Sequence, residues 1–218
     1  MNRRVFIIVF CIVTPLMVFG FWFFDGQLGS QKLSIKTTNV SEIEIYSKTN
    51  LDKPEKTLDG KDFSARLKKG DYTIKYTGSE GYADGTTSIS LSNDALKIEI
   101  NPWFSETKLA SMLKTEKQSI DTAILSQIKG VQLYVVQTGA LYEYGDWYGT
   151  VLKYNGEDFY NADSLRLVMK KENGKWLLKT NPPEIILTKA TFPEIPGQVL
   201  EAVNTQLAEI PSRYTSSD

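Results

Sequence analysis

The chain has 218 residues, of which 41% are hydrophobic and 11% aromatic, a composition typical of folded domains. Its 25 lysines and arginines nearly balance the 26 aspartates and glutamates. Because nucleic-acid binding requires a surplus of basic side chains, we expect no nucleic-acid partner. The chain has no histidine, and its one cysteine, Cys11, lies in a hydrophobic run. These absences exclude histidine-dependent triads and histidine-ligated metals, and we expect neither a metal nor another cofactor.

The hydrophobic run extends from Val5 to Phe24 and contains no charge. At ~1.5 Å per helical residue, a helix of this length crosses the ~30 Å hydrocarbon core of a bilayer. Arg3 and Arg4 precede the run, so the positive-inside rule places residues 1–4 in the cytoplasm and the rest of the chain outside. The alternative is a cleaved signal peptide, whose apolar region spans ~7–15 residues. The greater length, and the lack of a small-residue cleavage pair, favour an uncleaved single-pass anchor over residues 5–24.

A first module is expected over residues 31–101, after a short polar linker. Apolar side chains alternate there with polar ones, as in half-buried strands. The alternating residues are Leu33 and Ile35, Ile43 and Ile45, Tyr72, Ile74 and Tyr76, Ile89 and Leu91, and Ile98 and Ile100. Turn signals such as Lys69-Gly70-Asp71 separate these stretches. The spacing predicts a small all-β sandwich.

The stretch from Leu67 to Tyr76 (LKKGDYTIKY), followed by Gly81-Tyr82, resembles the core motif of PEGA domains. Asp59-Gly60 with Phe63 is similar to the first hairpin of that family. PEGA domains are small extracytoplasmic β-sandwiches, often attached to membrane-anchored bacterial proteins. The resemblance implies an accessory or spacer module, and it carries no catalytic residues over to this chain.

A second module is expected over residues 102–211 and opens on a helix. Asn101 and Pro102 are a typical helix start, with Asn as cap and Pro at the first helical position. Gly130 suits the C-terminal cap. The pattern fits one long helix, or two helices hinged near Gln118-Ser119. The apolar stripe that predicts this helical segment consists of Leu109, Met112, Leu113, Ile120, Ile124 and Ile128.

Short strands follow this helix, predicted at residues 131–138, 147–154, 165–170, 176–179 and 184–188. Asn173-Gly174 is a strong hairpin signal. A last apolar stripe from Val199 to Ile210 predicts a helix that Pro211 ends, and residues 212–218 are expected to form a flexible tail. A helix followed by antiparallel strands belongs to the α+β class.

The hairpin from Lys171 to Trp176 (KENGKW), with this order of elements, resembles the nuclear-transport-factor-2-like family. That resemblance implies an α+β cone, in which helices pack in a curved antiparallel sheet. The stretch from Asp146 to Thr150, with Asn181 to Glu184, is also similar to uncharacterised membrane-anchored bacterial proteins. This second likeness implies no activity.

The densest group of aromatic and acidic side chains lies between Leu141 and Asp163. One interpretation assigns the aromatics to the two faces of a curved sheet and the carboxylates to solvated loops. A second assigns sugar or peptide binding to exposed rings and nearby carboxylates, with Tyr142, Tyr144, Asp146, Trp147, Tyr148 and Asp158 as candidates. A third uses Asp146, Glu157 or Asp158 as an acid/base pair, whose carboxyls stand ~5–9.5 Å apart in glycosidases.

These inferences give one expected function and two alternatives. We expect a non-catalytic membrane protein whose two modules lie outside the cell membrane of a bacterium and serve in binding or as a scaffold. Its expected partners are the membrane, through Val5–Phe24, and an envelope protein, peptide or glycan. The alternatives are a carboxylate-dependent extracytoplasmic hydrolase and a carrier that holds a small ligand inside the second module.

Overall fold

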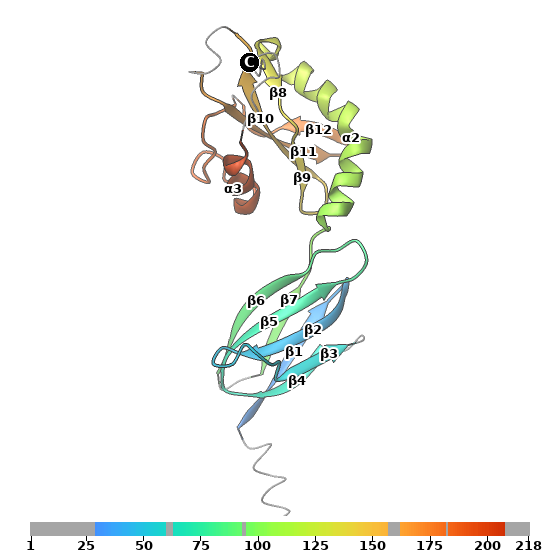
Figure 1. Ribbon diagram of the computed structural model, residues 1–218, viewed down its shortest axis with the longest axis vertical. Coiled ribbons are helices and arrows are strands. Elements are labelled where there is room, and N and C mark those ends of the chain that lie inside the picture. The colour runs from blue at the N-terminus through green and yellow to red at the C-terminus, as the bar shows by residue number, and fades with distance from the viewer. Residues whose placement is uncertain (1–28, 60–62, 93–94, 157–161, 182, 208–218) are drawn as a thin grey trace, which may run out of the picture. The chain divides into compact units, whose positions relative to one another are not determined.

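The computed structural model describes residues 29–59, 63–92, 95–156, 162–181 and 183–207 (Figure 1). The chain divides into two compact units between Pro102 and Trp103. The expected anchor, Val5–Phe24, and the expected tail, 212–218, lie outside the described residues. Among the helices that the structure describes, none has the length and apolar character needed to cross a membrane.

The first unit contains two β-sheets. One has the strand order β4-β1-β7 and the other β3-β2-β5-β6. All neighbouring strands are antiparallel except β1 and β7, which run parallel. The described strands are β1 (Ser30–Thr37), β2 (Val40–Ser47), β3 (Lys56–Asp59), β4 (Phe63–Lys68), β5 (Gly70–Gly78), β6 (Gly85–Leu91) and β7 (Leu96–Ile100).

The two sheets of the first unit share one hydrophobic core. Because side chains alternate between the faces of a strand, the alternating isoleucines and leucines all face inward. Leu33 on β1, Ile45 on β2 and Ile74 on β5 are fully buried in it. The first unit is therefore an all-β sandwich, as the alternation predicts.

Two strands of the sandwich pair differently from the expectation. The hairpin expected around Asp59-Gly60 is not formed, because β3 pairs with β2 in one sheet and β4 pairs with β1 in the other. The chain crosses back between the sheets at the β4–β5 turn. There the buried Tyr72 donates its hydroxyl proton to the Lys68 carbonyl at 2.9 Å, which fixes the corner.

The second unit combines one antiparallel sheet with two α-helices. The sheet has the order β12-β11-β10-β8, and β9 also pairs with β10, beside β8. Asn173 and Gly174 both have positive φ, 50° and 77°, in the predicted hairpin turn between β11 and β12. The described elements are α2 (Glu106–Gln127), the short 3₁₀ helix η1 (Val131–Leu133), β8 (Tyr134–Val136), β9 (Ala140–Tyr142), β10 (Trp147–Tyr154), β11 (Leu165–Glu172), β12 (Lys175–Leu178) and α3 (Gly197–Thr205).

Helix α2 begins later than the sequence predicts. Its cap is Ser105, whose side chain accepts a hydrogen bond from the Lys108 N–H, whereas Asn101 and Pro102 precede the helix. The helix continues without a break through Gln118-Ser119 and ends at Gln127. Of the two alternatives, one long helix is therefore the one observed, and the expected start of the helix is wrong.

The sheet of the second unit is covered on both faces (Figure 1). Helix α2 covers one face, where Ile120 and Ile124 pack against Leu152, Leu167 and Met169. Helix α3 and the segment before it cover the other face. Side chains thus fill the space between α2 and the sheet that a small-ligand carrier would need to keep open.

Polar contacts fasten α3 to the sheet. The Arg166 guanidinium on β11 donates to the carbonyls of Val203 and Asn204 at the C-terminal end of α3, at 3.2 and 3.0 Å. A cation at this end also faces the negative pole of the helix dipole.

Two elements near the C-terminus are shorter than the sequence predicts. Helix α3 ends at Thr205, before the expected Pro211. The strand expected at 184–188 is reduced to a single bridge between Glu184 and Arg166.

Candidate binding groove between helix α2 and strand β12

The candidate aromatic residues of the sequence do not share one surface. Trp147 and Tyr148 are adjacent on β10, so they point to opposite faces of the sheet and lie in different cores, with 4% and 3% of their surface exposed. Tyr144 is exposed and packs edge-to-face on Phe104. Stacking on a ligand requires an exposed ring face, which neither Trp147 nor Tyr148 offers.

Tyr142, too, is packed within the fold. Its hydroxyl accepts a hydrogen bond from the Gln206 amide at 3.0 Å, and its ring packs against the core beneath α3. Burial raises the pKa of Tyr142 to about 12, although the bond from Gln206 opposes the rise. Tyr142 therefore stays neutral at physiological pH and holds the end of β9 against α3.

The acidic candidates do not form a pair that the structure describes. Asp146 lies in the β9–β10 turn, with Oδ1 buried and without a hydrogen-bond partner. Burial raises the pKa of its neighbour Glu143, while the Gln198 amide, which donates to that carboxylate, opposes the rise. Glu157 and Asp158 lie outside the described residues, and Asp163 is exposed.

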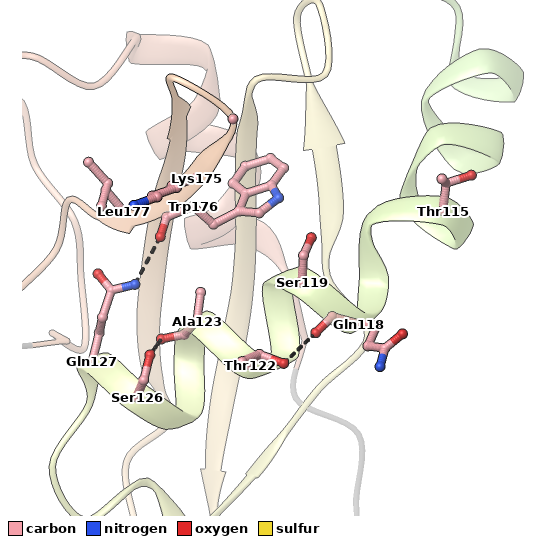
Figure 2. Close-up of a pocket in the computed structure, with 11 residues that line it drawn as sticks. Thr115, Gln118, Ser119, Thr122, Ala123, Ser126, Gln127, Lys175, Trp176 and Leu177 are labelled. Carbon is pink, nitrogen blue, oxygen red and sulfur yellow. Dashed lines mark hydrogen bonds between the residues drawn. The ribbon is translucent and has the colours of Figure 1, made fainter.

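An open groove of about 620 Å³ lies between α2 and β12 (Figure 2). Six of its eleven lining residues carry a hydroxyl or an amide group. Within this described lining, Lys175 supplies the one ionisable side chain. Helix α2 contributes Thr115, Gln118, Ser119, Thr122, Ala123, Ser126 and Gln127, and the β11–β12 hairpin contributes Gly174, Lys175, Trp176 and Leu177.

The hydroxyl groups of the helix wall are oriented by their own helix. Ser119 donates to the Glu116 carbonyl at 2.8 Å. Thr122 donates to the Gln118 carbonyl at 2.8 Å, and Ser126 donates to the Ala123 carbonyl at 3.1 Å (Figure 2). A hydroxyl has one proton and two lone pairs, so each oxygen can still accept a hydrogen bond. The helix wall therefore favours a ligand that presents N–H or O–H donors.

The strand wall is the outer edge of β12, and Gln127 occupies part of it. The Gln127 amide donates to the Trp176 carbonyl at 2.9 Å, and its oxygen accepts from the Leu178 N–H at 2.9 Å. A residue of a neighbouring strand makes two such hydrogen bonds, one with its N–H and one with its C=O. The edge of β12 is thus shown to accommodate an amide group.

The indole of Trp176 forms the base of the groove and is held in place. Its Nε1 donates to Glu116 Oε2 at 3.0 Å, and Glu116 Oε1 lies 2.6 Å from Lys171 Nζ. Two hydrogen bonds lower the pKa of Glu116: the one from Lys171 has the larger effect, and the one from Trp176 the next largest. Tyr148 packs against the indole edge-to-face, at 6.3 Å between ring centroids. This packing gives the groove a rigid base.

The chemistry of the groove suits binding. The Glu116 carboxylate lies 3.3 Å from the Ser119 hydroxyl, but it also accepts hydrogen bonds from Lys171 and Trp176, which lower its pKa and make it a poor base for activating a nucleophile. Among the described residues, no group of three or more carboxylate or thiol side chains is placed to hold a metal ion. What the lining offers is hydrogen bonding along α2, beside the stretch of the β12 edge that Gln127 occupies.

The sequence contains a signal for this groove that the aromatic-rich stretch obscures. Thr115, Ser119, Thr122 and Ser126 follow each other at intervals of three and four, so they lie on one face of α2, beside the apolar stripe. Surface helices more often carry charged side chains on such a face. The uncharged hydroxyl stripe is therefore a feature that sequence analysis can detect.

Comparisons with known proteins give no family for the chain. No protein-family model matches it, and neither does any curated protein. It is similar to two solved structures of DUF3823 family proteins. The one from Bacteroides ovatus is 11% identical with a TM-score of 0.26, over 58% of this chain and 56% of that chain. The one from Parabacteroides merdae is 12% identical with a TM-score of 0.28, over 58% of each chain. The chain thus spans a little over half of either protein.

Proposed function

We propose that this chain is a non-catalytic binding and scaffold protein of a bacterial envelope, anchored by Val5–Phe24. The first unit serves as a PEGA-like spacer, and the second, a variant of the nuclear-transport-factor-2-like fold, carries the binding site. The observation that supports this most is the groove between α2 and β12, with its uncharged, hydroxyl-rich helix wall and its rigid base. The anchor and the extracytoplasmic location rest on the sequence.

The ligand that fits the groove best is an extended polar chain, a peptide or a glycan. The groove is open along its length, whereas small-molecule sites enclose most of their ligand. From Thr115 to Gln127 the helix wall is ~18 Å long, the span of about five residues of extended peptide. Hydroxyl and amide groups along such a ligand supply the donors that the helix wall accepts.

A blocking substitution tests the site. In Thr122→Trp, an indole replaces an exposed side chain in the middle of the groove, whereas Lys114→Trp places the same ring on the same helix outside the lining. We expect the full chain to bind a member of an extended-peptide and glycan panel. Thr122→Trp should weaken that binding about tenfold or more, and Lys114→Trp should leave it unchanged. Equal binding by both variants would place the site elsewhere.

A labelling experiment tests the location separately. In a Cys11→Ser background, the exposed Ala190→Cys should react with a membrane-impermeant maleimide in intact cells. Asn2→Cys should react only after lysis, because residues 1–4 are expected in the cytoplasm. The opposite result would reverse the orientation and leave the groove proposal to its own test.

The alternatives have less support. A hydrolase needs two carboxyls ~5–9.5 Å apart that reach the substrate, and the candidate that the structure describes, Asp146, has its Oδ1 buried. A carrier needs an interior cavity, yet Leu152, Leu167 and Met169 are fully buried in the face that α2 covers.

A further inference from the structure

Strand β12 is the outermost strand of its sheet, and a side chain takes the place of a neighbouring strand there. The Gln127 amide donates to the Trp176 carbonyl and accepts from the Leu178 N–H, both at 2.9 Å; Figure 2 shows the first of these bonds. A carboxamide has the same N–H donor and C=O acceptor as a peptide group. The structure therefore shows what this stretch of edge accepts, and it is a peptide-like group.

Gln127 engages two of the four backbone groups that Trp176 and Leu178 turn toward this edge. The N–H and C=O of one residue point to the same side of a strand, so the Trp176 N–H and the Leu178 carbonyl face the edge as well. An extended peptide repeats its donors and acceptors every two residues, ~6.6–6.8 Å, as β12 does. It can pair with all four groups, whereas the hydroxyls of a glycan do not follow this repeat.

The hydroxyl groups of α2 fit the same added strand. The apolar stripe of α2 covers one face of the sheet, and the hydroxyl side chains lie next to that stripe, on the wall of the groove beside β12. A strand added to β12 extends the sheet beneath these hydroxyls, and every second side chain of it faces α2. Because Ser119, Thr122 and Ser126 can each still accept a hydrogen bond, side chains with N–H or O–H donors suit these positions.

The other face of the added strand meets Leu177. Trp176 belongs to the core beneath α2, so the next residue, Leu177, points to the opposite face of the sheet. The Leu177 side chain is 38% exposed. An apolar side chain of the added strand would cover it as a cross-strand neighbour. The two faces together favour an extended peptide whose polar and apolar side chains alternate.

Building on the binding role proposed above, we propose that the ligand of the groove is an extended peptide that displaces the Gln127 amide and adds to β12 as a further strand. Main-chain pairing at a sheet edge supplies affinity, and the side chains of alternate residues supply specificity. In the free chain Gln127 satisfies the edge and protects it from other strands. Gln127 therefore competes with the ligand, which has to replace both of its hydrogen bonds.

Removal of the competitor tests the displacement. The probe is an end-capped hexapeptide in which asparagine and valine alternate, titrated calorimetrically into the full chain in mild detergent. Gln127→Ala should bind it about tenfold more tightly than wild type does, because no internal hydrogen bond has to be broken first. Gln132→Ala removes an exposed glutamine of η1 outside the groove lining and should bind like wild type. If Gln127→Ala binds the hexapeptide no more tightly than wild type, Gln127 is a fixed part of the fold and the proposal is wrong.

Methylated peptides test the main-chain pairing without any change to the protein. Alternate residues of an extended peptide turn their N–H groups toward β12, and the residues between them turn theirs away. N-methylation of all the asparagines, or of all the valines, removes the donors of one edge at a time. One of these two peptides should bind about tenfold or more weakly than the parent, and the other should bind like it. Equal affinities of the two methylated peptides would contradict strand addition.

A glycan probe distinguishes a failure of the peptide proposal from a failure of the binding role. A chitin hexasaccharide that binds wild type but not Thr122→Trp, while the hexapeptide binds neither, would leave the groove as a binding site and overturn the peptide proposal. A hexapeptide that binds Thr122→Trp as well as wild type would place the site outside the groove, and both proposals would then be wrong. Binding of the hexapeptide alone, blocked in Thr122→Trp, is the expected result.

Discussion

At the scale of single residues, Gly149 decides how close α3 comes to the sheet. It lies on β10, facing the core of α3 between Trp147 and Val151. A Cβ at this position would overlap Cγ2 of Val203 and would lie 3.1 Å from the Tyr142 ring. Val203 is fully buried, so it has no room to move aside. The glycine is required by packing, since its backbone has no positive φ.

We predict that Gly149→Ala destabilises the second unit by about 1–3 kcal/mol, the usual cost of overpacking a core. Urea unfolding followed by tryptophan fluorescence measures this change. Gly197→Ala is the matched control, because nothing lies within 4 Å of its added Cβ and Gly197 begins α3. A stability change of the same size in both variants would show that α3 has space over Gly149.

The contact of Glu116 with Lys171 and Trp176 predicts a pH dependence. Since the pKa of Glu116 is lower in the folded chain than in the unfolded chain, this contact stabilises the fold above the unfolded pKa of about 4.5. The contribution is lost as the pH falls through the folded pKa.

Glu116→Gln should therefore lower the free energy of unfolding by about 1–3 kcal/mol at pH 7, the range for hydrogen bonds to charged groups. The difference from wild type should shrink as the pH falls below about 4.5. Asp121→Asn is the control, because its pair with Lys117 is exposed and contributes little. A difference between Glu116→Gln and wild type that is constant from pH 7 to pH 3 would contradict the expectation.

At the scale of elements, patterns with a clear period were predictable. The alternation around Ile45 and Ile74 predicted strands β2 and β5, and Asn173-Gly174 predicted the β11–β12 turn. The start of α2 was not predictable in the same way, because Asn101-Pro102 and Ser105 are both good caps and sequence alone does not choose between them. In the structure a tertiary contact accompanies the start at Ser105, because the N–H of the preceding Phe104 donates to the Glu143 carbonyl at 3.0 Å.

The candidate site was predictable only in part, for a reason that lies in strand geometry. The sequence between Leu141 and Asp163 is rich in aromatics, but β10 is covered on both faces, so Trp147 and Tyr148 are both buried. A strand covered on one face would have left one of them exposed. Whether the second face is covered depends on α3, which is distant in the sequence.

The edge of β12 carries its own prediction. If Gln127 replaces a neighbouring strand, Gln127→Ala leaves the Trp176 carbonyl and the Leu178 N–H without their partner. We expect a loss of about 1–2 kcal/mol and faster amide hydrogen exchange at Leu178. Gln118→Ala, on the same helix and in the same groove, should leave exchange at Leu178 unchanged. Unaltered exchange in Gln127→Ala would mean that water satisfies this edge equally well.

At the scale of the whole molecule, the cores of the two units have no residue in common. The three described tryptophans, Trp103, Trp147 and Trp176, all belong to the second unit, so their fluorescence reports on that unit alone. The two units can consequently be followed separately in one sample.

Ile74→Ala, in a Trp22→Phe background, should destabilise the first unit by about 2–5 kcal/mol, because Ile74 is fully buried in its core. Circular dichroism should show an earlier transition for the sandwich, whereas the tryptophan-detected midpoint should not move. A shift of both signals by the same amount would show that the two units unfold cooperatively.

The parallel pairing of β1 with β7 has a mechanical consequence. The chain enters the sandwich at Ser30, the start of β1, and leaves it at Ile100, the end of β7. Because these neighbours run in the same direction, tension between the two points slides one strand along the other. Their hydrogen bonds then resist the pull together, whereas a hairpin pulled from its two ends opens one bond at a time. A sandwich with this connectivity is suited to withstand tension applied between its two ends, and stretching a single molecule would measure the force at which it yields.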